Sequence, residues 1–231
     1  MVGHVSPLEG IRISRRTTQA QVAYNELRRA ITSGELPGGT HIVQSEWADR
    51  LDVSITPIRE AIRRLEQDGL AHSEAHKGTT VTQLSFEAAE EIYTLRRTLE
   101  PVQHRLAAGR LSGTVDEARE LCVEMNDVRD PVEFCDLDLR FHCMIMGLND
   151  SWTSRVARLL GIAAGPYITI SLHADPELMA VANEEHFQLL DALEDGDIER
   201  VISLNARHLE HAVSVLKTVR FPISSNKSVQ Q

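Results

Sequence analysis

The fold of the N-terminal part is decided by residues 51–70, which read LDVSITPIREAIRRLEQDGL. Ser54 is a residue type favoured as a helix cap, and Pro57 then falls in the first turn, where its missing N–H costs nothing. Apolar residues follow at helical spacing, namely Ile58, Ala61, Ile62 and Leu65. The stretch predicts a helix that is entered through a tight turn and buries one face.

The flanking residues complete a small domain. We expect a helix over residues 18–33, ended by Gly34, and a second helix over 45–51 with Ser45 as its N-cap. The apolar side of the first helix is expected to carry Val22, Leu27, Ala30 and Ile31. Two short strands, 70–73 and 79–83, follow the decisive helix. This order is typical of a winged helix-turn-helix, whose last helix enters the major groove of DNA.

From residue 85 onward the hydrophobic pattern is helical throughout. The predicted helices are 85–109, 114–127, 131–148, 151–163, 166–175, 177–194 and 197–218. Residues at or near their joints are Gly113, Gly147, Gly165, Pro176 and Gly196. The expected fold is therefore mostly α: an N-terminal winged helix-turn-helix followed by an all-α antiparallel helical bundle. The expected divisions are a flexible lead (1–17), a helix-turn-helix domain (18–84), an all-α domain (85–221) and a disordered tail (222–231).

Composition narrows the class of protein. Hydrophobic residues make up 42% and charged residues 25% of the 231, which excludes a disordered or collagen-like chain. No apolar run reaches the ~20 residues of a membrane span, residues 1–17 show no secretory signal, and three cysteines are too few for a disulfide framework. We therefore expect a cytoplasmic protein without a membrane partner. The net charge of −10 lies wholly beyond residue 82, so the neutral N-terminal part can still present a basic face to DNA.

One carboxylate and three imidazoles are expected to point into the bundle. Asp138 and His142 are four residues apart and share a helix face with apolar neighbours. His186 and His208 lie on apolar stripes of two later helices, and His211 is nearly co-facial with His208. An inward carboxylate is costly unless it is paired or bound to a metal.

These stretches resemble a known family. Residues 51–70, the segment ITSGELPGGT (31–40) and the segment KGTTV (77–81) closely resemble GntR-family bacterial transcription regulators. The later part is similar to the effector (FCD) domain of the FadR-type subgroup. Its matching pieces are RRTLE (96–100), DLRFH (138–142), EH (185–186), ALEDGD (192–197) and RHL (207–209). The resemblance covers roughly residues 18–218.

The resemblance implies a divalent metal site in the bundle. Its expected ligands are Asp138, His142, His186 and His208, where the family match selects His208 over His211. Imidazole ligands favour Zn²⁺, Ni²⁺ or Mn²⁺ over Mg²⁺ or Ca²⁺. Four protein ligands leave room on a six-coordinate ion for a small carboxylate effector. Candidate effector-binding residues are Arg96, Tyr167 and Asn205, although Arg96 could equally form an inter-helix salt bridge.

The DNA-binding candidates come from the turn, the decisive helix and the wing. They are Ser45, Ser54, Ile55, Thr56, Arg59, Arg63, His76 and Lys77. Arg59 is the expected reader of a base edge, and the wing tip is expected to reach the minor groove. Ile55 stands where the family usually has Arg, so it can meet a thymine methyl but cannot bind a guanine bidentately.

We therefore expect a non-enzymatic, ligand-responsive regulator, and a repressor in particular, because effectors release DNA in most such systems. A homodimer would bind a near-palindromic operator. One alternative is a metal-dependent enzyme with an accessory DNA-binding domain, although no second carboxylate is evident for proton transfer, since Glu184 and Glu185 should project away from His186. A second alternative is a purely structural metal, with the effector bound elsewhere.

Overall fold

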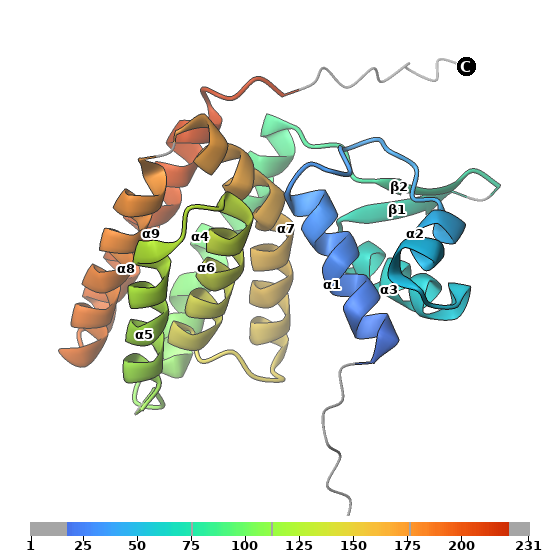
Figure 1. Ribbon diagram of the computed structural model, residues 1–231. Coiled ribbons are helices and arrows are strands. Elements are labelled where there is room, and N and C mark those ends of the chain that lie inside the picture. The colour runs from blue at the N-terminus through green and yellow to red at the C-terminus, as the bar shows by residue number, and fades with distance from the viewer. Residues whose placement is uncertain (1–17, 75, 112, 176, 222–231) are drawn as a thin grey trace, which may run out of the picture.

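The computed structural model describes residues 18–74, 76–111, 113–175 and 177–221. Our expectations for residues 1–17, Pro176 and residues 222–231 concern positions outside these ranges. The described chain forms a winged helix-turn-helix followed by a helical bundle, and the two lie side by side (Figure 1). The fold class predicted from the sequence is confirmed.

The N-terminal part contains three helices and one hairpin. Its elements are α1 (Gln19–Thr32), α2 (Gln44–Leu51), α3 (Ile55–Gln67), β1 (Ala71–Glu74) and β2 (Gly78–Val81). Ile58, Ala61 and Leu65 of α3 pack against Leu27 of α1, and all four are fully buried. Val22, however, is exposed, and its neighbour Ala23 is buried instead. The prediction that Val22 belongs to the buried face of α1 was therefore wrong, whereas Leu27, Ala30 and Ile31 are buried as predicted.

Helix α2 begins one residue earlier than its sequence predicts, and Ser45 is not its cap. Val43 holds the cap position without a side-chain hydrogen bond, and Ser45 lies exposed in the first turn. The reason is tertiary: Ile42 donates its N–H to the Thr79 carbonyl at 2.9 Å, so the chain up to residue 42 is pinned beside β2. The helix can start only where the chain leaves that pairing.

The turn between α2 and α3 is built around a left-handed residue. Asp52 has φ of 52° and closes α2, and Ser54 follows in an extended conformation at the start of α3. The Ser54 side chain makes no capping hydrogen bond. Residue 55 is thus the first helical residue, and the exposed start of α3 retains N–H groups that its own helix does not satisfy.

The wing is an antiparallel hairpin in which Ala71 pairs with Val81 and Glu74 with Gly78. His41 adds an isolated bridge to Thr80, so the stretch before α2 lies along the free edge of β2. β1 has its predicted length but begins one residue later, and β2 begins one residue earlier and is one residue shorter than predicted.

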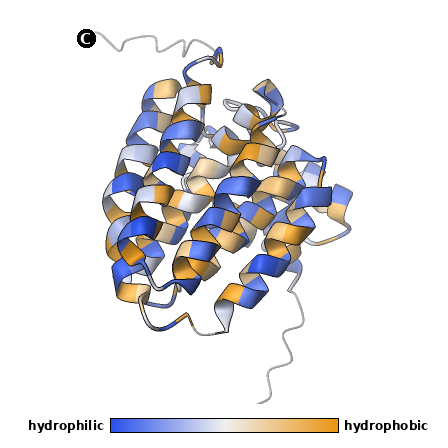
Figure 2. Ribbon diagram, turned by 90° about the vertical axis from the view of Figure 1, so that its left-hand side faces the viewer, coloured by the Kyte–Doolittle hydropathy of each residue, from blue (hydrophilic) through white to orange (hydrophobic). Residues whose placement is uncertain are grey.

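The bundle comprises α4 (Phe86–Ala107), α5 (Thr114–Asp127), α6 (Pro131–Ile145), α7 (Trp152–Ala174), α8 (Leu178–Glu194) and α9 (Ile198–Leu216). Helix α4 packs against α7 and α9, α8 packs against α5 and α9, and α6 packs against α5 and α7. Hydrophilic and hydrophobic residues alternate around the bundle helices (Figure 2). Gly113, Gly147 and Gly196 have positive φ at the joints where the sequence predicts them.

One predicted joint is wrong, because residues 151–163 and 166–175 belong to the single helix α7. Pro166 lies inside this helix and is buried. Proline removes a helical hydrogen bond, but burial on both sides holds the helix together here. Both α6 and α1 lie against the neighbouring Gly165, since a Cβ at this position would be in van der Waals contact with Cys135 Sγ at 3.6 Å and Thr32 Oγ1 at 3.8 Å.

Helix α7 is also the one described helix that is long and apolar enough to cross a membrane by length and composition. Half of its most apolar window is buried within the protein, where α4, α6 and α9 pack against it. Its composition is therefore that of a core helix.

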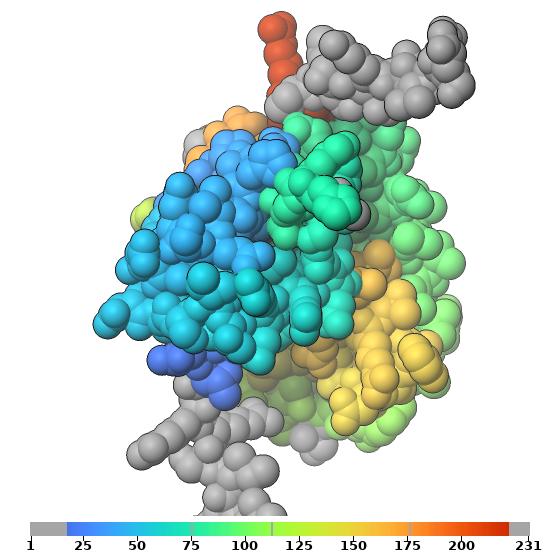
Figure 3. All heavy atoms as spheres, turned by 90° about the vertical axis from the view of Figure 1, so that its right-hand side faces the viewer, coloured from blue at the N-terminus to red at the C-terminus, as the bar shows by residue number. Residues whose placement is uncertain are grey.

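The two parts are joined by packing and by ion pairs. Arg28 of α1 contacts Asp136 of α6 at 2.7 Å, and Arg29 contacts Asp130 at 3.3 Å. Ile162 of α7 packs against the N-terminal core. Figure 3 shows the N-terminal part, in blue to teal, covering much of this face of the molecule.

Candidate metal centre and DNA-binding face

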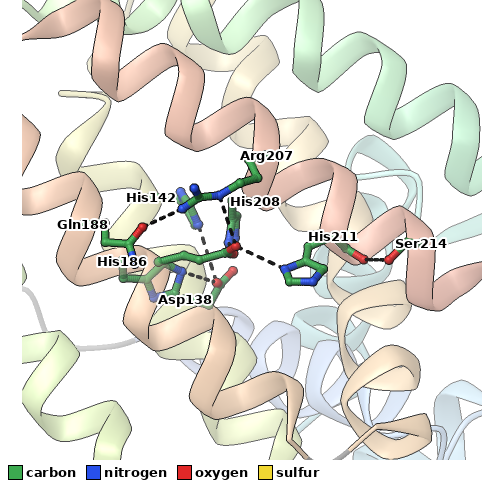
Figure 4. A network of polar contacts seen from close by, with 9 residues as sticks. Asp138, His142, His186, Gln188, Arg207, His208, His211 and Ser214 are labelled. Atoms are coloured by element: carbon green, nitrogen blue, oxygen red, sulfur yellow. Dashed lines mark hydrogen bonds and ion pairs between the residues drawn. The ribbon is translucent and has the colours of Figure 1, made fainter.

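Three bundle helices bring one carboxylate and three imidazoles together. Asp138 and His142 come from α6, His186 from α8 and His208 from α9. Each offers one ligand atom, and these atoms all lie within 4.8 Å of one another. Figure 4 shows the four side chains converging between the helices. The inward orientation inferred from helical periodicity agrees with this placement.

The distances within the cluster are those of side chains aimed at a common point. Asp138 Oδ1 lies 3.3 Å from His186 Nε2 and 3.6 Å from His142 Nε2. The three imidazole centroids are 5.0 to 5.1 Å apart. Phe141 packs against both His142 and His186, which fixes the planes of these two rings from the apolar side.

The protonation states suit a cation. Burial by itself raises the pKa of the Asp138 carboxyl, but the adjacent His142 and His186 imidazoles outweigh burial and hold that pKa well below its usual value. Burial lowers the pKa of His186, which Asp138 offsets only in part. Asp138 is therefore an anion and His186 a neutral imidazole at neutral pH, as metal binding requires.

The nitrogen atoms of His142 and His186 support the same conclusion. All four are buried, and none makes a well-formed hydrogen bond within the described part of the chain. The large majority of buried polar groups in folded proteins are satisfied, and four unsatisfied nitrogens on two touching rings are unusual. A divalent ion held by Asp138, His142, His186 and His208 would satisfy one nitrogen of each ring. The residues present therefore fit a metal with a preference for imidazole.

Glu185 is a functional candidate that the sequence analysis missed. It was expected to project away from the cluster, as its neighbour Glu184 does, but Glu185 is buried. Its carboxylate accepts hydrogen bonds from His208 Nδ1 at 2.8 Å and from His211 Nδ1 at 3.1 Å. Although burial raises its pKa, these two imidazoles lower it below the usual value. The signal in the sequence was the pair His208 and His211, one turn apart on the helix that faces Glu185.

His211 lies outside the cluster of four. Its side chain is 49% exposed, compared with 12% for His208. In Figure 4 its ring stands apart from Asp138, His142 and His186, toward Ser214. Sequence spacing alone left both His208 and His211 as candidate metal ligands, and the placement of the side chains favours His208.

A pocket with an empty volume of about 460 Å³, counted with its open mouth, adjoins the cluster. Its lining includes Arg96, Asp138, Glu185, His208 and Ser171. Arg96 Nε donates to Glu100 at 2.7 Å, and both side chains are buried. Arg96 therefore forms a salt bridge within α4 and not the inter-helix bridge that was foreseen, and its guanidinium still lies at the pocket.

Two other predicted effector residues do not line this pocket. Tyr167 packs in an apolar cluster with Tyr93 and Leu209, which do line the pocket, but Tyr167 itself lies behind them. Asn205 is buried and donates from Nδ2 to Glu100 Oε2 at 2.7 Å, so it supports the Arg96–Glu100 pair. Helical phase could not distinguish a pocket wall from this supporting position.

The predicted DNA-contacting residues lie at the surface of the N-terminal part. The exposed set is Ser45, Ser54, Ile55, Thr56, Arg59, Arg63, His76 and Lys77. Arg59 Nε donates to Gln44 Oε1 at 3.1 Å, which holds the guanidinium at the exposed side of α3 beside the start of α2. Lys77 pairs with Glu74 at the wing, and His76 has a φ of 65°.

Comparison with known proteins identifies both parts. Residues 19–81 match the model of the bacterial regulatory proteins of the gntR family, and residues 91–211 match the FCD domain. A relative from Paenarthrobacter nicotinovorans, named "Probable D-xylose utilization operon transcriptional repressor", is 33% identical over 189 residues, which span 80% of this chain and 82% of the relative. The HTH-type transcriptional repressor RspR of Escherichia coli K12 is 23% identical over 209 residues, 87% of this chain and 90% of RspR.

Solved structures share the fold. A GntR transcriptional regulator from Rhodococcus sp. RHA1 matches with a TM-score of 0.71 and 27% identity, covering 87% of this chain and 99% of that one. McbR/YncC of E. coli matches with a TM-score of 0.72 over 87% of this chain and 98% of that one, at 22% identity, which shows the fold alone. The relatives are DNA-binding transcriptional regulators and not enzymes, so the metalloenzyme alternative falls. This chain belongs to the GntR family of bacterial transcriptional regulators and carries an FCD domain.

Proposed function

We propose that this regulator is a repressor whose helical bundle binds a divalent metal and, at that metal, a small organic acid that releases the protein from its operator. The observation that carries the proposal is the buried cluster of Asp138, His142, His186 and His208. Two relatives whose names include the word repressor support the direction of control. We assign DNA binding to residues 18–84 and sensing to residues 85–221.

The four side chains would hold Zn²⁺, Ni²⁺ or Mn²⁺. When bound, such an ion supplies a positive charge and open coordination positions for a carboxylate. The pocket beside the cluster brings Arg96 to the same place. Because Arg96 uses Nε for Glu100, its terminal amino groups remain to form a fork onto a carboxylate.

On the DNA side, the start of α3 would lie in the major groove. Ser54, Ile55 and Thr56 would meet bases or a phosphate, with Arg59 as the base reader. Arg63 would reach the backbone or a base, Ser45 a phosphate, and the wing tip with His76 and Lys77 the minor groove. Since operator recognition takes place on chromosomal DNA, we place the protein in the cytoplasm.

A second copy of the chain would complete the operator complex. Exposed apolar residues lie on two helices that pack against each other: Leu95, Val102 and Leu106 on α4, and Trp152, Val156 and Leu159 on α7. We call this surface the α4/α7 face; the start of α7 stands at the surface in yellow in Figure 3. Contiguous exposed apolar residues mark an interaction surface. A symmetric dimer through this face would present two α3 helices to a near-palindrome.

Elemental analysis of the purified protein tests the metal site. We expect about one transition-metal ion per chain in the wild type and a large loss of metal in Asp138→Asn and His186→Ala. His72→Ala, which changes a histidine exposed on the wing, should keep the metal content of the wild type. Equal metal content in all four proteins would contradict the proposal.

A titration then separates a sensing metal from a structural one. Candidate organic acids are tested by thermal shift, since a specific ligand raises the melting temperature according to its concentration relative to Kd. We expect an acid that stabilises metal-loaded protein, releases DNA, and has no effect on metal-stripped protein that is still folded. Undiminished binding of the acid to the stripped protein would assign the ion a structural role.

A further inference from the structure

We propose that Glu185 is the positioning residue of the metal centre: by accepting a hydrogen bond from His208 Nδ1, it aims His208 Nε2 at the cluster and raises the affinity for the ion. The proposal rests on the metal site proposed above and adds to it a residue that is not one of the four ligands. Glu185 would act through His208 and would not itself touch the ion.

The geometry of His208 leaves one nitrogen for a metal. Its Nδ1 lies 2.8 Å from Glu185 Oε2, and a carboxylate accepts this bond only if Nδ1 carries the proton. In the neutral imidazole Nε2 then keeps its lone pair. His142 and His186 likewise point Nε2 at Asp138, so the three rings would present the same nitrogen.

The other two imidazoles are held in a different way. Phe141 packs against His142 and His186, and Phe134 stacks on His186. Among the described residues, His208 has no such aromatic neighbour beyond the other two ligand rings, and it lies nearer the surface, with 12% of its side chain exposed. Packing fixes two of the ligands, whereas the third depends on a polar anchor.

Glu185 is itself held on both oxygens. Oε2 takes the His208 bond, while Oε1 accepts from His211 Nδ1 at 3.1 Å and lies 3.8 Å from Arg207 Nε. The carboxylate thus bridges α8 and α9, one residue before the ligand His186. His211 and Arg207 cover it on the solvent side, which explains how a carboxylate this close to the surface stays oriented.

Such outer contacts matter for affinity. A carboxylate behind a ligand histidine fixes its tautomer and ring orientation and raises its basicity, and losing it costs about 10–100-fold in metal affinity. Glu185 also adds a second negative charge to a site whose four ligands contribute only one, at Asp138.

The test measures Zn²⁺ affinity by competition with a chromophoric chelator at neutral pH. We expect Glu185→Gln to bind Zn²⁺ about 10–100-fold more weakly than the wild type. The matched control is Glu184→Gln, which makes the same change of charge at the adjacent exposed residue of the same helix and should leave the affinity unchanged. His211→Ala, which removes only the outer donor, should stay much closer to the wild type than Glu185→Gln.

A second measurement reports the position of the proton directly. In metal-free protein labelled with ¹⁵N-histidine, we expect the His208 signals of the wild type and of Glu184→Gln to be those of the Nδ1–H tautomer. In Glu185→Gln the tautomers should become mixed, while the melting temperature of the metal-free protein changes little.

The outcomes are distinguishable. If the wild type binds Zn²⁺ and Glu185→Gln binds it equally well, or if both glutamate variants lose affinity alike, the role of Glu185 is refuted and the metal site stands. An unchanged His208 tautomer in Glu185→Gln would also refute it. If the wild type itself does not bind Zn²⁺, the proposed metal site fails, and this role of Glu185 falls with it.

Discussion

Arg59 shows what a single side chain can contribute at the DNA surface. It is exposed on α3, and its contact with Gln44 Oε1 orients it without burying it. Replacing it with alanine should weaken binding to a DNA sequence selected by the protein by about 1–3 kcal/mol, because a bidentate contact to a base edge is lost. Binding to random DNA should change much less. Fluorescence anisotropy on both DNAs measures the difference.

The control for Arg59 is Arg200→Ala, which removes the same charge from α9, far along the chain from the DNA-binding part. It should leave both affinities near the wild type. If Arg59→Ala weakened selected and random DNA equally, Arg59 would be a phosphate contact and not a base reader.

His104 makes the stability of the fold depend on pH. It is buried in α4 without a hydrogen-bond partner for either ring nitrogen among the described residues, and burial lowers its pKa to about 4. In the unfolded chain the pKa is about 6.5. Between these values the unfolded state binds the proton first, so this part of the stability is complete above about pH 6.5 and is lost as pH falls toward 4. The loss reaches at most about 3 kcal/mol.

Urea unfolding at several pH values checks this dependence. His104→Leu should unfold with a flatter dependence on pH than the wild type between about pH 6.5 and 4. His72→Leu, a change at an exposed histidine, should leave the dependence as it is. Parallel curves for the wild type and His104→Leu would show that the imidazole is not the source.

Single residues also show how far sequence reasoning reaches. Helical phase was sufficient to turn Asp138, His142 and His186 inward, because their apolar neighbours mark the buried side. Helical phase failed for Glu185, because a side different from that of His186 was taken to lie away from the cluster. Helix α9 covers that side of α8 and buries both residues. The pair His208 and His211 signals a partner on the facing helix, but only the packing of α9 against α8 shows that this partner is Glu185.

Among the elements, the bounds of α7 and α2 differ from those predicted for the same reason, which is packing against a distant part of the chain. The sequence Gly165-Pro166 normally ends a helix, but packing against α6 and α1 keeps α7 continuous. Ser45 is a favoured cap, but pairing with β2 moves the start of α2 to residue 44. In both cases a contact distant in sequence outweighs a local preference worth about 1–3 kcal/mol.

The contribution of the Arg28–Asp136 salt bridge between α1 and α6 can be measured as a coupling free energy. Arg28 and Asp136 are partly shielded, with 17% and 37% of their side chains exposed, so their coupling should fall near 1–2 kcal/mol, between surface and buried pairs. A double-mutant cycle with Arg28→Ala and Asp136→Ala, read by urea unfolding, gives this value.

The neighbouring pair Arg29–Asp130 is the matched control. It joins α1 to the N-cap residue of α6, but it is more exposed and longer, at 3.3 Å. Its cycle should give less than about 0.5 kcal/mol. Equal coupling in the two cycles would mean that shielding does not strengthen the inner pair.

For the whole molecule, the α4/α7 face predicts the oligomeric state. Light scattering coupled to size exclusion should give the mass of two chains for the wild type. Val102→Glu should shift the protein toward one chain, because it places a charge in a face that the second copy would bury. Val123→Glu on α5 is the control: Val102 is 44% and Val123 56% exposed, but Val123 lies outside the face. A dimeric Val102→Glu would contradict the assignment.

The overall architecture was largely readable from the sequence. Eight of the nine described helices lie within about three residues of predicted ends at both termini, because glycine and proline punctuate the chain and each helix carries a periodic apolar stripe. What could not be read was which side chains share one pocket. Tyr167 and Asn205 were predicted beside Arg96 as effector contacts, but pocket walls depend on how six helices are placed together.

Helix α6 holds Asp136, which secures α1, two residues before Asp138 of the candidate metal centre. One short length of rigid backbone is therefore common to both contacts, and no flexible joint separates them. Thermodynamic reciprocity gives this arrangement a consequence. If a ligand bound in the bundle changes the affinity for the operator by some factor, then the operator must change the affinity for that ligand by the same factor. A DNA-bound regulator would thus respond to a different concentration of its effector than a regulator that is free of DNA.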